Sequence, residues 1–110
     1  MKSVRVFADS EMMAEEIACR WYREAEIANK VKGVFSVVLS GGTTALKVYH
    51  KIASPLWVNK IPWKVVHVFW ADERCVLPES QESNYQIILR TFLNHVPIPD
   101  ENVHRIKGEE

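Results

Sequence analysis

A strand-to-helix turn is encoded by the stretch Val37-Val38-Leu39-Ser40-Gly41-Gly42-Thr43-Thr44. Its first part is apolar and β-branched, as in a buried strand. The glycine pair permits a positive φ and a close approach of the backbone to a ligand, while the threonines can cap a helix or donate hydroxyl hydrogen bonds. Backbone N–H groups and the positive end of a helix dipole then favour phosphate. A plain strand-to-helix connection can have the same sequence, so both interpretations stay open.

Neither a cofactor nor a metal ion is predicted. The stretch lacks the lysine spacing of a nucleotide-binding loop and the G-x-G-x-x-G pattern of dinucleotide sites. The two cysteines are far apart in sequence, which favours reduced thiols over a disulfide or a metal site. The histidines show no ligand spacing either. These residues are Cys19, Cys75, His50, His67, His95 and His104.

Length and charge restrict the class of protein. A chain of 110 residues, 47% hydrophobic and 25% charged, is expected to form one globular domain. Fourteen basic and fourteen acidic side chains cancel, so neither nucleic acid nor a membrane surface is an expected partner. Asp9 and Glu11 lie where a signal peptide needs its apolar stretch, and no run approaches the ~18 apolar residues of a membrane span. We expect a cytoplasmic protein.

The apolar pattern predicts alternating strands and helices. Amphipathic periodicity indicates a first helix between residues 10 and 33 and a second that ends at Ser54-Pro55. Ser83 has the spacing of a capping box with Gln86 at the start of a third helix. The strands are predicted near residues 4–8, 34–39 and 65–70, with a short strand or extended tail at 102–106.

The strand at 65–70 is almost continuously apolar, which is typical of a parallel strand buried on both faces. His67 within it is therefore expected to be a core histidine rather than a catalyst. Trp21 lies on the apolar stripe of the first helix and is likewise expected in the core.

Three consecutive charged residues, Asp72-Glu73-Arg74, follow this strand. Ligands of open parallel α/β sheets bind outside the carboxyl ends of the strands, and the glycine turn also lies at such an end. A solvated loop whose charges pair with one another is the alternative interpretation. Because two strand ends carry such features, we favour a shared site.

Taken together, these residues resemble the N-terminal part of 6-phosphogluconolactonases, within the superfamily that includes glucosamine-6-phosphate isomerases. Ser40-Gly41-Gly42-Thr43-Thr44 is similar to the S-G-G-[ST]-[ST]-P loop of the family, with Ala45 in place of the proline. Asp72-Glu73-Arg74 is similar to its D-E-R motif and Ser83-Asn84-Tyr85 to its S-N-Y motif. Further matches are Trp63, His104-Arg105-Ile106 and Gly108-Glu109. The arginine favours the lactonase, since isomerases usually have D-E-Y.

The resemblance implies a three-layer, Rossmann-like α/β fold of the NagB/RpiA/CoA-transferase type, with residues 1–110 forming its N-terminal part. It implies that 6-phosphogluconolactone is hydrolysed to 6-phosphogluconate in the oxidative pentose phosphate pathway. The phosphate would bind Ser40, Gly41, Gly42, Thr43 and Thr44. Asp72 would orient the sugar or the attacking water, and Arg74 would contact phosphate or ring oxygens, while Glu73 holds the loop.

One part of the family pattern is missing. Family members are about twice as long, and their catalytic histidine lies in a G-x-D-G-H-type motif that this sequence lacks. We therefore expect an incomplete fold without the catalytic base, and self-association through the uncovered edge of the sheet. The alternatives are a non-catalytic sugar-phosphate-binding fragment and, less favoured, an isomerase.

Overall fold

The computed structural model describes residues 10–71, 73, 76, 77, 79–81 and 83–107. The predicted strand at 4–8 lies outside these residues. The helices are α1 (Ser10–Lys30), α2 (Thr43–Ile52), α3 (Pro55–Val58) and α4 (Asn84–Thr91), and the strands are β1 (Phe35–Leu39), β2 (Val66–Trp70) and β3 (Val103–His104). Single 3-10 turns lie at Trp63–Val65, Leu93–His95 and Asp100–Asn102.

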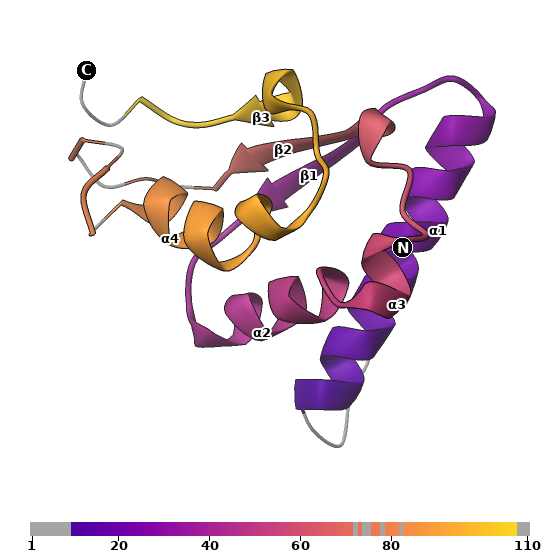
Figure 1. Cartoon of the computed structure of the whole chain (residues 1–110), viewed down its shortest axis with the longest axis horizontal. Coiled ribbons are helices and arrows are strands. Elements are labelled where there is room, and N and C mark those ends of the chain that lie inside the picture. Colours follow the sequence, from indigo (N-terminus) through magenta and orange to yellow (C-terminus); the bar gives the residue numbers. More distant parts are fainter. Residues whose placement is uncertain (1–9, 72, 74–75, 78, 82, 108–110) are drawn as a thin grey trace, which may run out of the picture.

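The strands form a parallel sheet in the order β1-β2-β3, and Figure 1 shows their arrows pointing the same way. Leu39 at the end of β1 is the register partner of Trp70 at the end of β2. The pairing continues one step further, because the Ala71 N–H donates to the Leu39 carbonyl at 2.8 Å. The parallel α/β prediction is confirmed, and the ends of β1 and β2 lie side by side.

The helices follow the predicted apolar stripes closely. α1 buries alanines and Trp21, which is 6% exposed, so the prediction of a core tryptophan is confirmed. α1 ends at Lys30, and Lys32 in the turn that follows is left-handed, with φ 56°, one position before Gly33. The second helix stops at Ile52, shortly before its predicted end at Ser54-Pro55, and Pro55 then begins α3, which the sequence did not indicate. Proline suits that first helical position because its missing N–H would have no partner there anyway.

One face of the sheet carries the core. Leu39, Val66, Val68 and Trp70 are at most 5% exposed and belong to one apolar cluster with the buried residues of the helices. Phe92 lies at its centre, with its ring stacked on Tyr49 at a centroid distance of 5.1 Å. Burying such a side chain contributes roughly 1.5–3 kcal/mol.

The opposite face of the sheet is open to solvent, so the expectation that the strand at 65–70 is buried on both faces is wrong. Val38 is 65% and Phe69 39% exposed. His67 is not a core histidine either: it is half-buried beside His104, with its Nδ1 3.0 Å from His104 Nε2. The cause is the placement of the described helices, most of whose buried residues join the apolar cluster on the other face.

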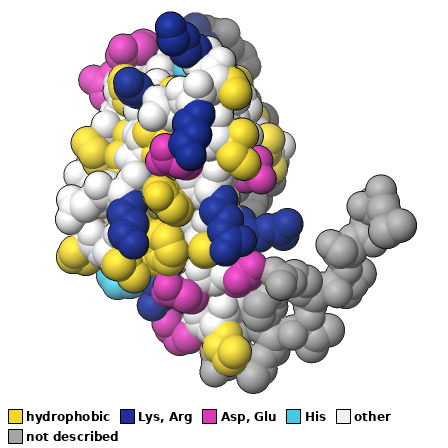
Figure 2. Space-filling model, turned by 90° about the vertical axis from the view of Figure 1, so that its right-hand side faces the viewer, with side chains coloured by type: hydrophobic (Ala, Val, Ile, Leu, Met, Phe, Trp, Pro, Cys, Tyr) yellow, Lys and Arg dark blue, Asp and Glu magenta, His cyan; other side chains and the backbone are white. Residues whose placement is uncertain are grey.

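Charges are mixed over the surface that α1 presents. Figure 2 shows Lys and Arg side chains interspersed with Asp and Glu on this face. Within the described part of the chain, no helix is long and apolar enough to cross a membrane.

Candidate functional site

The five residues predicted to bind phosphate line one hollow of about 520 Å³. Ser40, Gly41 and Gly42 connect β1 to α2, and Thr43 and Thr44 are the first residues of α2; we call Ser40–Thr44 the glycine loop. The hollow is completed by apolar side chains of α1, by β1 and by Tyr49. The structure therefore brings the predicted loop residues together at the carboxyl end of β1, as ligand sites of parallel sheets require.

Gly42 has the backbone conformation that only glycine adopts easily. Its φ is 109° and its ψ 155°, and it occupies the N-cap position of α2. A side chain there would have open space around it, since nothing lies within 4 Å of an added Cβ. Backbone strain rather than crowding therefore requires glycine at this position.

The N-terminus of α2 is available to an anion. The first N–H groups of a helix have no partner within the helix. The helical hydrogen bonds of α2 begin with the Leu46 N–H, which donates to the Gly42 carbonyl at 3.0 Å. Among the described residues no side chain caps this end, and the first turn holds no acidic residue. The helix dipole and the N–H groups of this first turn thus favour a negatively charged ligand at this end.

The N-terminus of α4 shows the opposite situation, because the chain itself supplies an anion there. The carboxylate of Glu73 accepts from the Asn84 N–H at 2.7 Å, the Tyr85 N–H at 2.9 Å and the Ser83 hydroxyl at 2.8 Å. Ser83 in turn accepts from the Gln86 N–H at 3.2 Å, which confirms it as the cap. Glu73 therefore holds the loop after β2 against α4.

Gly41, which follows β1, lies against Asn84, the first residue of α4. A Cβ added to Gly41 would lie 3.0 Å from Asn84 Oδ1, which is closer than ordinary van der Waals contact. Gly41 is thus required for a close approach rather than for its φ. Through Asn84, the glycine loop lies against the helix that Glu73 caps.

Tyr49 of α2 binds the backbone of Ser40, the first residue of the loop, and sequence reasoning missed this role. Its hydroxyl accepts from the Ser40 N–H at 2.9 Å and donates to the Ser40 carbonyl at 2.8 Å. Burial raises the pKa of the phenol, while the hydrogen bonds with Ser40 act in the opposite direction. The apolar stripe of the helix indicated a buried ring at this position, but no pattern indicated the target of its hydroxyl.

Two predicted site residues, Asp72 and Arg74, lie outside the described residues. The described residues next to them form hydrogen bonds: Ala71 with the end of β1, and Glu73 with the start of α4. Among the side chains that the structure does describe, no three of His, Cys, Asp or Glu gather as a metal site.

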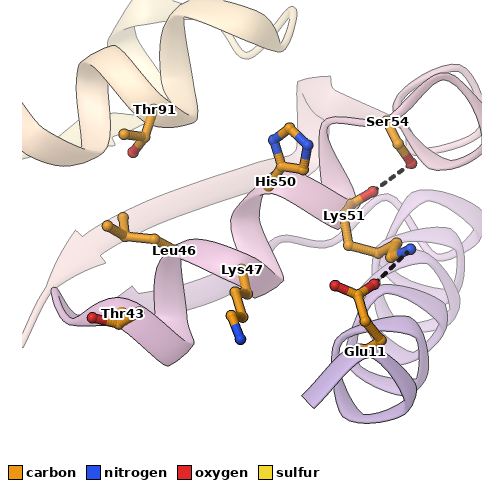
Figure 3. Close-up of a pocket in the computed structure, with 8 residues that line it drawn as sticks. All are labelled: Glu11, Thr43, Leu46, Lys47, His50, Lys51, Ser54 and Thr91. Atoms are coloured by element: carbon orange, nitrogen blue, oxygen red, sulfur yellow. Dashed lines mark hydrogen bonds and ion pairs between the residues drawn. The ribbon is translucent and has the colours of Figure 1, made fainter. Parts of the chain in front are cut away.

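A second hollow, of about 560 Å³, lies beside α2 and shares Thr43 with the first (Figure 3). It is lined partly by basic residues, but Lys51 there is paired with Glu11 at 3.3 Å and with Glu15 at 3.8 Å. Lys47 donates to the Ser10 hydroxyl at 3.1 Å. Because carboxylates already offset the charge of Lys51, we place the candidate anion site at the glycine loop.

Comparisons with known proteins show the family to which this parallel α/β chain is similar. Residues 8–110 match the family model described as glucosamine-6-phosphate isomerases/6-phosphogluconolactonase. The chain is 35% identical over 105 residues to the 6-phosphogluconolactonase of Nostoc sp., covering 96% of this chain and 42% of that relative. It is 36% identical over 87 residues to the 6-phosphogluconolactonase of Haemophilus influenzae, covering 79% of this chain and 38% of that relative.

The similarity to 6-phosphogluconolactonases extends to a solved structure. The 6-phosphogluconolactonase of Thermotoga maritima superposes with a TM-score of 0.79 at 30% sequence identity, covering 96% of this chain and 46% of that protein. The chain thus spans less than half the length of the relatives that it matches.

Proposed function

This chain belongs to the glucosamine-6-phosphate isomerase/6-phosphogluconolactonase family, and from this membership we propose that it is the phosphate-binding part of a 6-phosphogluconolactonase. The observation that carries the proposal is the N-terminus of α2 after the glycine loop, which no described side chain caps. The contrast with α4 supports it, since the equivalent end of that helix is filled by the carboxylate of Glu73.

In the proposed complex the phosphate of the substrate sits on the loop between Ser40 and Thr44. Backbone N–H groups of the first turn of α2 donate to its oxygens, and the hydroxyls of Thr43 and Thr44 add further hydrogen bonds. Ser40 contributes its side chain rather than its backbone, because its N–H and carbonyl are both bonded to Tyr49. The phosphate then acts as a remote handle that holds the lactone in one orientation.

Hydrolysis of the lactone also requires catalytic groups in addition to those that bind the phosphate. Water forms a bond to the ester carbonyl carbon, the bond from that carbon to the ring oxygen breaks, and a proton from the water ends on that oxygen. A base must take the proton first, and positive or N–H groups must stabilise the oxyanion. We assign orientation of the sugar or water to Asp72 and contact with phosphate or ring oxygens to Arg74. The base is assigned to the part of the family domain that this sequence lacks.

An assay of the 110-residue chain tests this division of roles. We expect it to bind 6-phosphogluconate, followed by tryptophan fluorescence because Trp21 lines the loop hollow. We expect hydrolysis of 6-phosphogluconolactone little above the rate in buffer. A rate well above the spontaneous one that Asp72→Ala abolishes would show that the base lies in this chain.

Two alternatives give different outcomes. A fragment without function would bind no sugar phosphate at all in the same titration. An isomerase would release ammonia from glucosamine 6-phosphate, and the arginine at position 74 disfavours it because family isomerases usually carry tyrosine there.

A further inference from the structure

Two histidine side chains meet on the solvent-exposed face of the sheet. His67 lies on β2, and His104 lies on β3, 37 positions further along the chain. Nδ1 of His67 is 3.0 Å from Nε2 of His104, which is hydrogen-bond distance. Because His67 is half-buried and His104 is exposed, solvent reaches the pair.

The two imidazole rings meet edge to edge. Their planes differ by only 9°, and their centroids are 5.3 Å apart, well beyond the 3.0 Å that separates the two nitrogens. The facing nitrogens therefore lie between the ring centres and point at each other. Phe69 supports the pair, because its ring is stacked on that of His104 with centroids 4.6 Å apart.

The strands around the pair carry no charged side chain. None of the residues of β1, β2 and β3 is Asp, Glu, Lys or Arg. The register partner of His67 on β1 is Ser36, which is exposed. Two imidazoles thus face each other on an uncharged part of the sheet, and imidazole nitrogens are preferred ligands of divalent transition-metal ions.

We propose that His67 and His104 form a two-ligand site for a divalent transition-metal ion, with water at the remaining positions. Metal–imidazole bonds are about 2.0–2.1 Å long, so two nitrogens bound at right angles lie about 3.0 Å apart and two bound tetrahedrally about 3.4 Å apart. The observed 3.0 Å matches the right-angle geometry of Ni²⁺ and Cu²⁺ better than the tetrahedral geometry of Zn²⁺. The proposal does not depend on phosphate binding.

Binding of the ion requires the pair to rearrange. The proton between the facing nitrogens moves to the far nitrogen of the ring that carries it, so both facing nitrogens offer a lone pair and no proton is released. The rings also turn within their common plane, because the ion lies beside the line that joins the nitrogens. Such a turn keeps the His104 ring parallel to the ring of Phe69 and preserves their stack.

Calorimetric titration of the 110-residue chain with NiCl2 tests the site. We expect His67→Gln and His104→Gln each to weaken Ni²⁺ binding about tenfold or more, because each removes one of the two protein ligands. The matched controls are His50→Gln and His95→Gln, which change the other two histidines of the chain and should leave the affinity unchanged. Zn²⁺ is expected to bind the wild-type chain about tenfold more weakly than Ni²⁺.

A second readout uses only the wild-type chain and so does not depend on whether the variants fold. Ni²⁺ is paramagnetic and broadens the NMR signals of nearby amides. The signals of His67, Phe69 and His104 are expected to disappear first, while those of His50 and His95 persist.

Several results would overturn the proposal. These are no binding of Ni²⁺ to the wild-type chain, unchanged affinity in His67→Gln or His104→Gln, and equal weakening by the control variants. Broadening centred on His50 or His95 would also overturn it, and so would Zn²⁺ binding as tight as that of Ni²⁺.

Discussion

Gly41 and Asn84 are 43 positions apart in the sequence, yet a Cβ on Gly41 would lie 3.0 Å from Asn84 Oδ1. This contact joins the glycine loop after β1 to the start of α4, which Glu73 holds against the end of β2. The predicted phosphate loop and Glu73, the one described residue of the charged triplet, therefore lie at the same end of the sheet. Changes on either side of the contact are expected to affect the loop.

Gly41→Ala is expected to displace the loop, because the added methyl group must push the Asn84 side chain away. Gly33→Ala is a matched control, since its Cβ would meet Val31 Cγ2 at an ordinary 3.5 Å. We expect Gly41→Ala to weaken binding of 6-phosphogluconate about tenfold, a loss of ~1.4 kcal/mol. Calorimetric titration measures it. A smaller loss for Gly41→Ala when Asn84 is also alanine would show coupling, and strictly additive losses would exclude it.

Gly42→Ala is expected to act through the backbone alone. The φ of 109° and ψ of 155° lie in a region that other residues avoid, while an added Cβ has nothing within 4 Å. The substitution should cost ~1–3 kcal/mol of folding free energy, or shift the loop to a new conformation that binds phosphate poorly. Urea unfolding together with the titration separates these outcomes. An alanine variant with wild-type stability and affinity would mean that the positive φ has no role.

Tyr49→Phe removes the hydroxyl that binds both backbone groups of Ser40. Leaving a part-buried N–H and carbonyl without that partner is expected to cost ~1–3 kcal/mol. Tyr85→Phe serves as a control for the loss of a tyrosine hydroxyl elsewhere. Thermal unfolding measures both, and equal effects of the two variants would contradict a special role for Tyr49.

The same tyrosine predicts a dependence of stability on pH. Burial raises the pKa of Tyr49 above its ordinary value of 10.0, so the folded state holds the phenol proton more tightly than the unfolded state. This contribution to stability is fully present below pH 10 and is lost as the pH rises through the raised pKa. The free energy of unfolding should fall more steeply above pH 10 for the wild type than for Tyr49→Phe. Parallel curves would contradict the assignment.

Glu73→Gln is expected to loosen the start of α4. An amide oxygen accepts more weakly than a carboxylate and does not interact with the helix dipole as a charge, so the loss should be ~1–2 kcal/mol. Glu79→Gln, at an exposed turn position, makes the same chemical change and should alter the free energy of unfolding by less than ~0.5 kcal/mol. If both variants unfold at the same urea concentration, the three hydrogen bonds of Glu73 contribute nothing measurable.

The sequence predicted the elements well where periodicity and end signals agreed. The cap at Ser83 placed the start of α4 correctly, and the proline after α2 placed the end of that helix to within about two residues. Gly33 indicated the end of α1, but the left-handed residue is Lys32, because composition alone does not say which of two adjacent residues takes the positive φ.

The errors concern features that depend on distant parts of the chain. The expectation of burial on both faces of β2 assumed a complete fold, and the described chain has helices on one face only. Tyr49 and Asn84 were visible as parts of helices, but their contacts with Ser40 and Gly41 depend on how α2 and α4 pack against the loop. Such contacts have no signature in the local sequence.

The most direct test of the central claim is an amide NMR titration of the 110-residue chain with 6-phosphogluconate. Gluconate, which lacks the phosphate, is the matched control ligand. We predict that the amide signals of Gly41, Gly42, Thr43, Thr44 and Ala45 shift with 6-phosphogluconate and stay in place with gluconate. Unmoved loop signals, or shifts confined to the hollow around Lys47 and His50, would contradict the assignment of the glycine loop as the phosphate site.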